Sequence, residues 1–310
     1  MRILVVCSAK NGHAAPFIEE QAMSLRKLGI EIDYYYIEKK GIVGYLSALS
    51  GLKKKITLFQ PSLIHAHYGL SGLLANLQRK VPVITTFHGS DINDPKVRKW
   101  SKIAIKLSRY SIFVSQKTLD IARPKKNFAL IPCGIDLTEF YPIKKEDARR
   151  QLGWSETKRY ILFAGGFDNE VKNSPLAKAA SAQLPDVELV ALIGFSRQQV
   201  NLLINGSDVA LLTSFTEGSP QFIKEAMACN CPIVATNVGD IKQLIDGIEG
   251  CYCTSFEVND VAEKLKMVLH FAQKNGKTSG REKLGKSSLS LADVATQIEL
   301  IYKKCTNAHE

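Results

Sequence analysis

Two glutamates flank the expected start of a helix in the second half of the chain. Glu217 is followed by Gly-Ser-Pro, and seven residues separate it from Glu225. Glycine, serine and proline at a helix N-terminus leave backbone N–H groups that bind a phosphate well. Carboxylates beside a phosphate are unfavourable unless they accept hydrogen bonds from sugar hydroxyls. The spacing therefore indicates a nucleotide-sugar site, with donor contacts from Glu217, Gly218, Ser219, Pro220, Gln221 and Glu225.

Lys172 is the candidate cation for the same ligand. It precedes a second expected helix, and Gly165 and Gly166 end the strand before it. Adjacent glycines let a ligand approach the backbone closely. A lysine at a helix start would clamp a diphosphate together with residues 218–221. Taken alone, Lys172 would be interpreted as one solvated lysine among many. Considered together with the two glutamates, it is interpreted as a diphosphate-binding residue.

His88 is the candidate catalytic residue of the first half. It follows the apolar run Val81–Phe87 and precedes Gly89. The carboxyl end of a strand in a parallel sheet lies at the ligand crevice. A neutral imidazole there would hydrogen-bond a sugar hydroxyl or act near a reacting oxygen. Asp91 follows, and it is interpreted either as an acceptor-side group or as a helix N-cap.

His65 and His67 end the preceding expected strand and leave an alternative open. Together with His88 they would suit a metal ion, since imidazole is a common metal ligand. No carboxylate or thiolate lies near them in the sequence, which favours a hydrogen-bonding role instead.

The loop after the first expected strand, Ser8–Pro16, lacks the G-x-G-x-x-G pattern of dinucleotide-binding dehydrogenases. This argues against that class of enzyme. Gly12 and His13 in the loop are further acceptor-side candidates, although an ordinary turn between strand and helix would also explain Gly12.

Alternating strand and helix patterns position these residues. Short β-branched and apolar runs alternate with segments of helical periodicity in both halves, which predicts parallel sheets built from βαβ units. The expected strands are Ile3–Cys7, Glu31–Ile37, Leu63–His65, Val81–Phe87, Ser111–Ser115, Phe128–Pro132, Tyr160–Phe163, Val187–Ile193, Val209–Thr213, Ile233–Thr236 and Gly250–Cys253. The expected helices are Pro16–Leu28, Gly44–Phe59, Gly69–Arg79, Lys96–Arg109, Ser174–Gln183, Arg197–Asn205, Pro220–Cys229, Val258–Gln273 and Leu289–Cys305. The polar stretch Lys274–Ser288 is predicted to be a loop.

The segment Asp136–Gly153 interrupts this alternation and is interpreted as a linker. The predicted fold class is therefore α/β, with two Rossmann-like parallel-sheet domains whose ligand crevices face an interdomain cleft. Residues 1–143 would form an acceptor domain and residues 144–288 a nucleotide-sugar donor domain. Residues 289–310 would form a crossing helix and tail that packs back on the first domain.

The composition is that of a globular protein, with 45% hydrophobic and 23% charged residues, and no apolar run is long enough to span a membrane. The N-terminus begins with a strand pattern and lacks a signal-peptide pattern, so the chain is expected in the cytoplasm. The seven cysteines mostly lie in apolar runs. The two Cys-x-Cys pairs have the wrong spacing for a zinc ribbon, which favours buried small hydrophobic residues over metal ligands.

The net charge of +11 is concentrated in the first half. Residues 1–155 contain 25 Lys/Arg and 12 Asp/Glu, whereas the remainder contains 16 and 18. Such a basic surface attracts nucleic acid, anionic lipid or acidic small molecules. No nucleic-acid recognition motif accompanies it, so no nucleic-acid partner is expected. The candidate contacts for an anionic membrane are Gly44–Phe59 and Lys96–Arg109, although solvated lysine faces explain either helix equally well.

At these residues the chain resembles family 4 glycosyltransferases of the GT-B fold, and most closely bacterial members that serve surface-polysaccharide assembly. The resemblance extends over nearly the full length, and its most specific part is the pair of glutamates with the flanking Glu-Ala-Met-Ala-Cys. The parts of the chain that carry it are the opening strand, His88-Gly89, Ile131–Asp136, Phe140, Pro142, Lys172, Glu217 to Glu225, Pro232, Gly250 and the terminal helix.

The resemblance implies transfer of a sugar from a nucleotide-diphosphate sugar, of UDP or GDP type, to a glycan or lipid-linked acceptor. The family retains the anomeric configuration and requires no metal. On this chain Lys172 would hold the donor diphosphate, Glu225 the ribose and Glu217 the donor sugar, while His88 would face the transferred sugar. The implied location is the cytoplasm, at the inner face of the cell membrane if the basic domain docks there.

Two departures from the family pattern concern the donor side. Many members carry an arginine where this chain has Gly166, so half of the usual cationic clamp is missing. The chain also passes from Val187–Ile193 through one short helix to Asp208–Thr213, where members usually have a further strand and helix.

These departures leave two alternatives open. One is a non-catalytic subunit that binds a nucleotide sugar. The other is a different enzyme of the same fold, such as a nucleotide-sugar epimerase or a phosphorylase. A phosphorylase would normally carry a cofactor lysine or a phosphate-binding arginine near the site, and Gly166 removes the obvious arginine.

Overall fold

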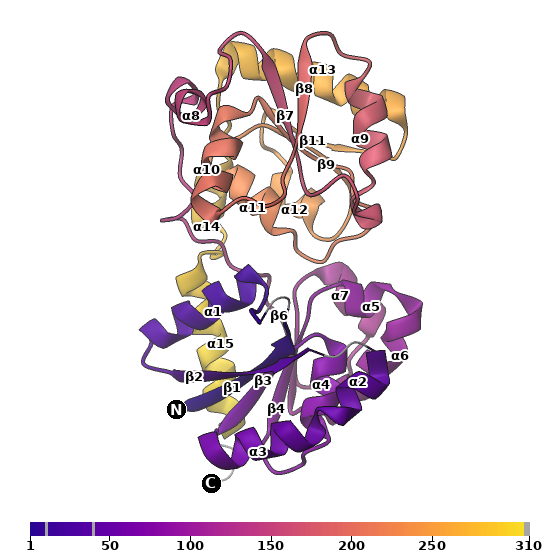
Figure 1. Ribbon diagram of the computed structural model, residues 1–310, viewed down its shortest axis with the longest axis vertical. Helices are drawn as coiled ribbons and strands as arrows, with labels where there is room; N and C mark the ends of the chain where they lie inside the picture. The colour runs from indigo at the N-terminus through magenta and orange to yellow at the C-terminus, as the bar shows by residue number, and fades with distance from the viewer. Residues whose placement is uncertain (10–11, 39–40, 307–310) are drawn as a thin grey trace. The chain divides into compact units, whose positions relative to one another are not determined.

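Two parallel β-sheets organise the chain in the computed structural model, which describes residues 1–9, 12–38 and 41–306. The chain divides into two compact units. The first comprises Met1–Gly134 together with the C-terminal segment from Leu291, and the second comprises Ile135–Ser290. Figure 1 shows one sheet in each unit, with helices packed against it. The expected α/β fold class, with one parallel sheet in each of two units, is confirmed.

The first unit contains a six-stranded sheet in the order β2-β1-β3-β4-β5-β6, with every pair parallel. Its central strands are buried over their whole length because helices cover both faces. The strands are β1 Arg2–Ser8, β2 Glu31–Ile37, β3 Leu63–His67, β4 Val83–Phe87, β5 Tyr110–Phe113 and β6 Phe128–Leu130.

The C-terminal helix α15 belongs to the first unit. It packs beside α1, and both helices contribute to one apolar cluster with β1. Tyr302 on α15 is fully buried in this cluster, and Ser24 on α1 donates a hydrogen bond to the carbonyl of Leu291. The helices of this unit are α1 Pro16–Lys27, α2 Gly41–Ser47, α3 Leu49–Phe59, α4 Gly69–Asn76, α5 Ser90–Asn93, α6 Pro95–Leu107, α7 Gln116–Ala122 and α15 Leu291–Thr306.

The second unit contains a five-stranded parallel sheet in the order β11-β10-β9-β7-β8. Its two faces bury separate apolar clusters, one with α10 and α11 and the other with α9 and α13. The strands are β7 Arg159–Phe163, β8 Val187–Ala191, β9 Val209–Leu212, β10 Ile233–Thr236 and β11 Cys251–Thr254. The helices are α8 Lys145–Leu152, η1 Glu170–Lys172, α9 Ser174–Ser181, α10 Arg197–Gly206, α11 Gln221–Ala228, α12 Ile241–Ile245, α13 Val258–Asn275 and α14 Gly280–Lys286.

The prediction of a loop over Lys274–Ser288 is wrong. Helix α13 extends to Asn275, and α14 fills much of the remainder. Only Gly280 and Leu284 of α14 are buried. Its sequence is therefore mostly polar and lacks the apolar periodicity that predicts a helix. A Cβ on Gly280 would lie 2.9 Å from the backbone of Met227, so this helix depends on close packing against α11.

The polar segment Asp136–Gly153 also contains a helix, α8. Arg149 on α8 is buried and forms an ion pair of 2.7 Å with Asp208, which precedes β9. The expected helix over Gly44–Phe59 is divided at Ala48 into α2 and α3.

The seven cysteines form no disulfide within the described part of the chain, and five of them are buried. No helix among the described residues combines the length and apolarity needed to cross a bilayer.

Candidate functional site

Lys172 and Glu217 meet at the carboxyl-terminal edge of the second sheet. Lys172 ends η1, which follows β7, and Glu217 lies in the loop after the neighbouring β9. The Lys172 ammonium lies 2.7 Å from the Glu217 carboxylate, and their side chains are 23% and 16% exposed. The two loops are also joined through the backbone, because the Phe215 N–H donates to the Val171 carbonyl at 3.0 Å. The sequence prediction therefore identified a pair that is in direct contact.

Glu225 lies on α11, whose N-terminal side carries the Gly-Ser-Pro segment, and the N-cap residue Pro220 makes no side-chain capping hydrogen bond. Its carboxylate is 5% exposed and lies 2.7 Å from the guanidinium of Arg197, the first residue of α10. Burial raises the pKa of Glu225, whereas Arg197 and Lys224 lower it. The guanidinium of Arg197 also covers the ring of Phe140, 4.4 Å from its centroid.

Arg197 was not among the residues predicted for the site. A signal for it exists in the sequence, because it begins a helix directly after β8. All strands of this sheet are parallel, so every segment that follows a strand starts at the same edge.

Hydrogen bonds between buried polar side chains anchor the segment between Glu217 and Glu225. Lys224 is fully buried and donates to the Ser219 hydroxyl at 2.6 Å, and that hydroxyl donates to Asp240 at 2.5 Å. Burial raises the pKa of Asp240, and Lys224 opposes that shift. The predicted phosphate-binding segment is thus anchored by residues whose importance was not apparent from the sequence.

Gly165 and Gly166 follow β7, as expected, and each is constrained. Gly165 has φ +147°, and a Cβ there would lie 3.1 Å from the Lys172 side chain. At Gly166 a Cβ would lie 2.5 Å from the Asp168 carboxylate and 2.9 Å from Ile193. A side chain at position 166 therefore requires the side chains of Asp168 and Ile193 to move.

His88 in the first unit follows β4 and contacts a second histidine. Its Nε2 lies 3.0 Å from Nδ1 of His67, and the rings of Phe17 and Tyr68 pack on it at 4.9 and 4.7 Å. Burial, and then His65, lower the pKa of His88, and burial likewise lowers that of His67. Both imidazoles are therefore neutral at neutral pH, and one ring nitrogen of the pair donates to the other.

His65 is hydrogen-bonded at both ring nitrogens. Nδ1 lies 2.6 Å from the Tyr302 hydroxyl and Nε2 lies 2.7 Å from the Thr86 hydroxyl. Among the described residues no group of three or more His, Cys, Asp and Glu side chains is arranged to hold a metal ion. The arrangement of the three histidines thus favours the hydrogen-bonding alternative over the metal alternative.

The acceptor-side candidates are spread over the first unit. Asp91 is buried, and its carboxylate accepts backbone N–H groups of His88 and Gly89 at 3.0 Å each, and of Gly69 at 2.9 Å. It fixes the loop that carries His88.

The other two candidates, His13 and Gly12, lie in the loop after β1. His13 has a side chain that is 79% exposed and lies 3.8 Å from Glu19. Gly12 has φ +79°, and a Cβ added there would meet no atom of the described residues within 4 Å. This conformation is that of an ordinary turn.

Comparison with known families extends over both units. Residues 3–139 match Glycosyltransferase Family 4, and residues 154–270 match Glycosyl transferases group 1. The chain belongs to glycosyltransferase family 4.

Among its relatives, this family 4 chain is 26% identical over 215 residues to TuaC of Bacillus subtilis (strain 168), which is assigned as a glycosyltransferase of teichuronic acid biosynthesis. That match covers 59% of this chain and 55% of TuaC. The chain spans between about half and two thirds of the length of the curated relatives it matches.

Solved structures show the same fold. A sucrose-phosphate synthase from Thermosynechococcus elongatus superposes with a TM-score of 0.85 at 18% identity, over 99% of this chain and 100% of that chain. Anabaena HepE in complex with UDP superposes with a TM-score of 0.77 at 17% identity, over 98% and 100%. These likenesses establish the GT-B fold of the family 4 chain.

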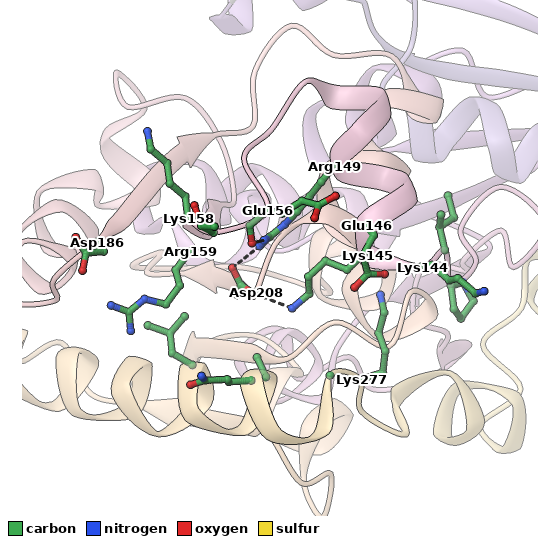
Figure 2. A pocket seen from close by; sticks show the side chains of 17 residues that line it. Lys144, Lys145, Glu146, Arg149, Glu156, Lys158, Arg159, Asp186, Asp208 and Lys277 are labelled. Carbon is green, nitrogen blue, oxygen red and sulfur yellow. Dashed lines mark hydrogen bonds and ion pairs between the residues drawn. The ribbon is translucent and has the colours of Figure 1, made fainter.

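A cavity of about 990 Å³ lies at the opposite, amino-terminal edge of the second sheet. Residues that begin or precede β7, β8 and β9 line it, namely Arg159, Asp186 and Asp208. Figure 2 shows Asp208 between Lys145 and Arg149, each 2.7 Å from its carboxylate. The cavity thus lies at the edge of the sheet opposite to Lys172 and Glu217, and Asp208 in it is paired with two cations.

Proposed function

We propose that this chain transfers a sugar from a nucleotide-diphosphate sugar to a glycan or lipid-linked acceptor, with retention at the anomeric carbon, in the assembly of a surface polysaccharide. The observation that carries the proposal is the convergence of Lys172, Glu217 and Glu225 at one edge of the second sheet, around the start of α11. The assignment of TuaC to teichuronic acid biosynthesis supports the polysaccharide role.

The donor diphosphate would bind between Lys172 and the backbone of residues 218–221. Lys172 pairs with Glu217 at 2.7 Å, so an incoming diphosphate would share this ammonium with the carboxylate. The N-terminal end of α11 contributes a favourable electrostatic field for the phosphates. Glu217 would then be left to accept hydrogen bonds from the donor sugar, and Glu225 from the ribose.

Catalysis would depend on positioning and on stabilisation of the leaving group. The acceptor hydroxyl oxygen would attack the anomeric carbon from the face of the leaving group as the bond to the diphosphate oxygen breaks. The acceptor proton would pass to that diphosphate oxygen, so the step needs no further base. The neutral imidazole of His88 is the proposed hydrogen-bonding group for the transferred sugar.

The donor nucleotide is proposed to be of UDP type, with GDP as the alternative. HepE, which shares the fold, has been solved with UDP and also with UDP-glucose. No cofactor beyond the donor is proposed. The acceptor side is proposed to include a contact with anionic lipid through the exposed lysines of α3 and α6 in the first unit.

Release of nucleoside diphosphate from a panel of UDP- and GDP-sugars, with bacterial glycan or lipid extract as acceptor, tests the proposal. We expect turnover of at least one donor, and a loss of roughly 10²–10³-fold in kcat/KM for Lys172→Met, because the leaving group loses its cation. Lys158→Met is the matched control, since Lys158 pairs with Glu188 at 3.1 Å at the other end of β7.

The same assay, combined with calorimetric titration of UDP and GDP, distinguishes the non-catalytic alternative that Gly166 raised in the sequence. Tight nucleotide binding without turnover of any donor would make the chain a binding subunit and would contradict the enzymatic proposal. Equal activity of Lys172→Met and Lys158→Met would contradict the role of Lys172.

A further inference from the structure

We propose that Arg197 is a positioning residue that keeps the buried carboxylate of Glu225 ionised and oriented, so that it can accept the ribose hydroxyls of the donor nucleotide. This inference rests on the proposed function, because it assumes that Glu225 binds ribose. It adds to that function a residue of α10 that lies 28 positions from Glu225 in the sequence.

The contact between Arg197 and Glu225 places a full positive charge against a nearly inaccessible carboxylate. The Glu225 side chain is 5% exposed and that of Arg197 is 31% exposed, with 2.7 Å between NH1 and Oε1. A buried carboxyl group is strongly driven to take up a proton unless a cation or several N–H donors oppose this. The partly exposed guanidinium of Arg197 therefore stabilises the ionised form of Glu225, which burial destabilises.

The packing around Arg197 fixes the direction of its guanidinium. The group lies over the Phe140 ring, 4.4 Å from the centroid, and Phe140 is fully buried. A guanidinium held on an aromatic face loses little further conformational freedom when it pairs with a carboxylate. This geometry sets one orientation for Glu225 and leaves the second carboxylate oxygen for another partner.

The other titratable groups of α11 and its C-terminal end act on Glu225 less directly. Lys224 lowers the pKa of Glu225, and its ammonium is directed to Ser219. The neighbouring thiol of Cys229 stays protonated because burial raises its pKa. These groups therefore do not replace the contact that Arg197 makes.

Helix α14 packs against α11, and its charged side chains are directed elsewhere. Lys283 donates to the carbonyls of Gln243 and Asp246. Arg281 donates to the carbonyls of Phe140 and Ala228. Glu282 pairs with Lys286 at 2.6 Å. Arg197 is accordingly the residue on which the ionisation of Glu225 depends most.

The ionisation state decides what Glu225 can do for a ribose. An ionised carboxylate accepts hydrogen bonds at both oxygens, whereas a protonated one offers a donor in place of an acceptor. Hydrogen bonds to the ionised form are also about twice as strong as neutral ones. Binding should strengthen as pH rises through the pKa of Glu225 and become constant above it. Without Arg197 this pKa moves upward, and the rise in affinity moves to higher pH with it.

Calorimetric titration of UDP and GDP into the full chain, between about pH 5.5 and about pH 9, tests the inference. The variants are Arg197→Met, which keeps packing on Phe140, and Arg197→Lys, which keeps the charge. We expect Arg197→Met to bind about tenfold more weakly at the low end of this range and to recover toward the high end. Arg197→Lys should restore most of the affinity and the wild-type pH profile.

Two controls separate this inference from the proposed function. Glu225→Gln should bind weakly with a flat pH profile, and adding Arg197→Met to it should change little. A 2′-deoxynucleotide should show a smaller dependence on Arg197, because it lacks one of the ribose hydroxyls. If Glu225→Gln binds UDP and GDP like wild type, the ribose role of Glu225 fails, and the proposed function with it.

The inference alone fails if Glu225→Gln weakens binding while the pH profile of Arg197→Met matches that of wild type. It also fails if Arg197→Met tightens binding at every pH, since Arg197 would then compete with the ribose for the carboxylate. Thermal melting without nucleotide identifies any variant that has lost its fold, and in that case Arg197→Lys alone decides the outcome through its pH profile.

Discussion

Residue by residue, the donor side is held by two ion pairs that join distant parts of the sequence and by a buried hydrogen bond between residues five positions apart. Lys172 contacts Glu217, Arg197 contacts Glu225, and Lys224 contacts Ser219. The first pair could be predicted from the sequence because both residues lie at strand ends of one parallel sheet. The pairing of Arg197 with Glu225 could not, since the carboxylate that a cation contacts is identified only when the packing of α10 on α11 is known.

Gly239 shows how closely the segments of this site approach each other. It has φ +61°, and a Cβ there would lie 2.4 Å from the carbonyl oxygen of Gly218. We expect Gly239→Ala to lower the free energy of unfolding by about 1–2 kcal/mol from backbone strain. We expect a further loss of about 1–3 kcal/mol, because the Gly218 segment must move away. Nucleotide affinity should fall as well, since that segment is proposed to bind the diphosphate.

Gly247→Ala is the matched control for this prediction. Gly247 has φ +72°, and no atom of the described chain lies within 4 Å of an added Cβ, so only the backbone strain applies. Urea unfolding and nucleotide titration of both variants provide the comparison. Equal losses in the two variants would show that the contact with Gly218 has no separate importance.

At the scale of elements, the strands were predictable and some helices were not. Strands β2 and β10 have the predicted bounds, and the other strands differ by one or two residues at one or both ends. Buried strands of a parallel sheet are continuous apolar runs, which sequence shows directly. Helices α8 and α14 escaped prediction because their polar sequences gain stability from tertiary contacts, namely Arg149 with Asp208 and Gly280 with Met227.

The residues of the candidate site also divide into those that could be predicted from the sequence and those that could not. The sequence supplied the residues that follow strands, including His88 and Lys172, because strand order and direction place them at a known edge of each sheet. It did not show that Asp91 is buried beneath the His88 loop or that His65 binds Tyr302 of the C-terminal helix. Those contacts join residues up to 237 positions apart, which no local pattern encodes.

At the scale of the whole molecule, the charge is divided unequally along the chain. The first 155 residues carry a net charge of +13, and in α6 the exposed residues include Lys102 and Lys106 beside Ile103 and Leu107. A helix surface that combines lysines with exposed apolar residues suits the headgroup region of an anionic bilayer. This is the basis for the proposed contact with the membrane.

Cosedimentation with phosphatidylglycerol-containing vesicles checks this contact. We expect binding that weakens with added salt, and a loss of about tenfold or more for the double variant Lys102→Glu with Lys106→Glu, since each lysine near the surface is worth about 1 kcal/mol. The same charge change at Lys266 and Lys274 on α13 serves as control. Equal losses of vesicle binding in both double variants would show that binding depends only on net charge, which would contradict a specific role of α6.

The central claim is that the carboxyl-terminal edge of the second sheet binds the nucleotide-diphosphate part of the donor. Calorimetric titration of UDP and GDP into wild type, Lys172→Met, Glu225→Gln and the control Lys158→Met measures this most directly. We predict that one nucleotide binds to wild type and to Lys158→Met alike, and about 10- to 100-fold more weakly to the other two variants. Absence of binding to wild type, or equal affinity in all four proteins, would contradict the claim.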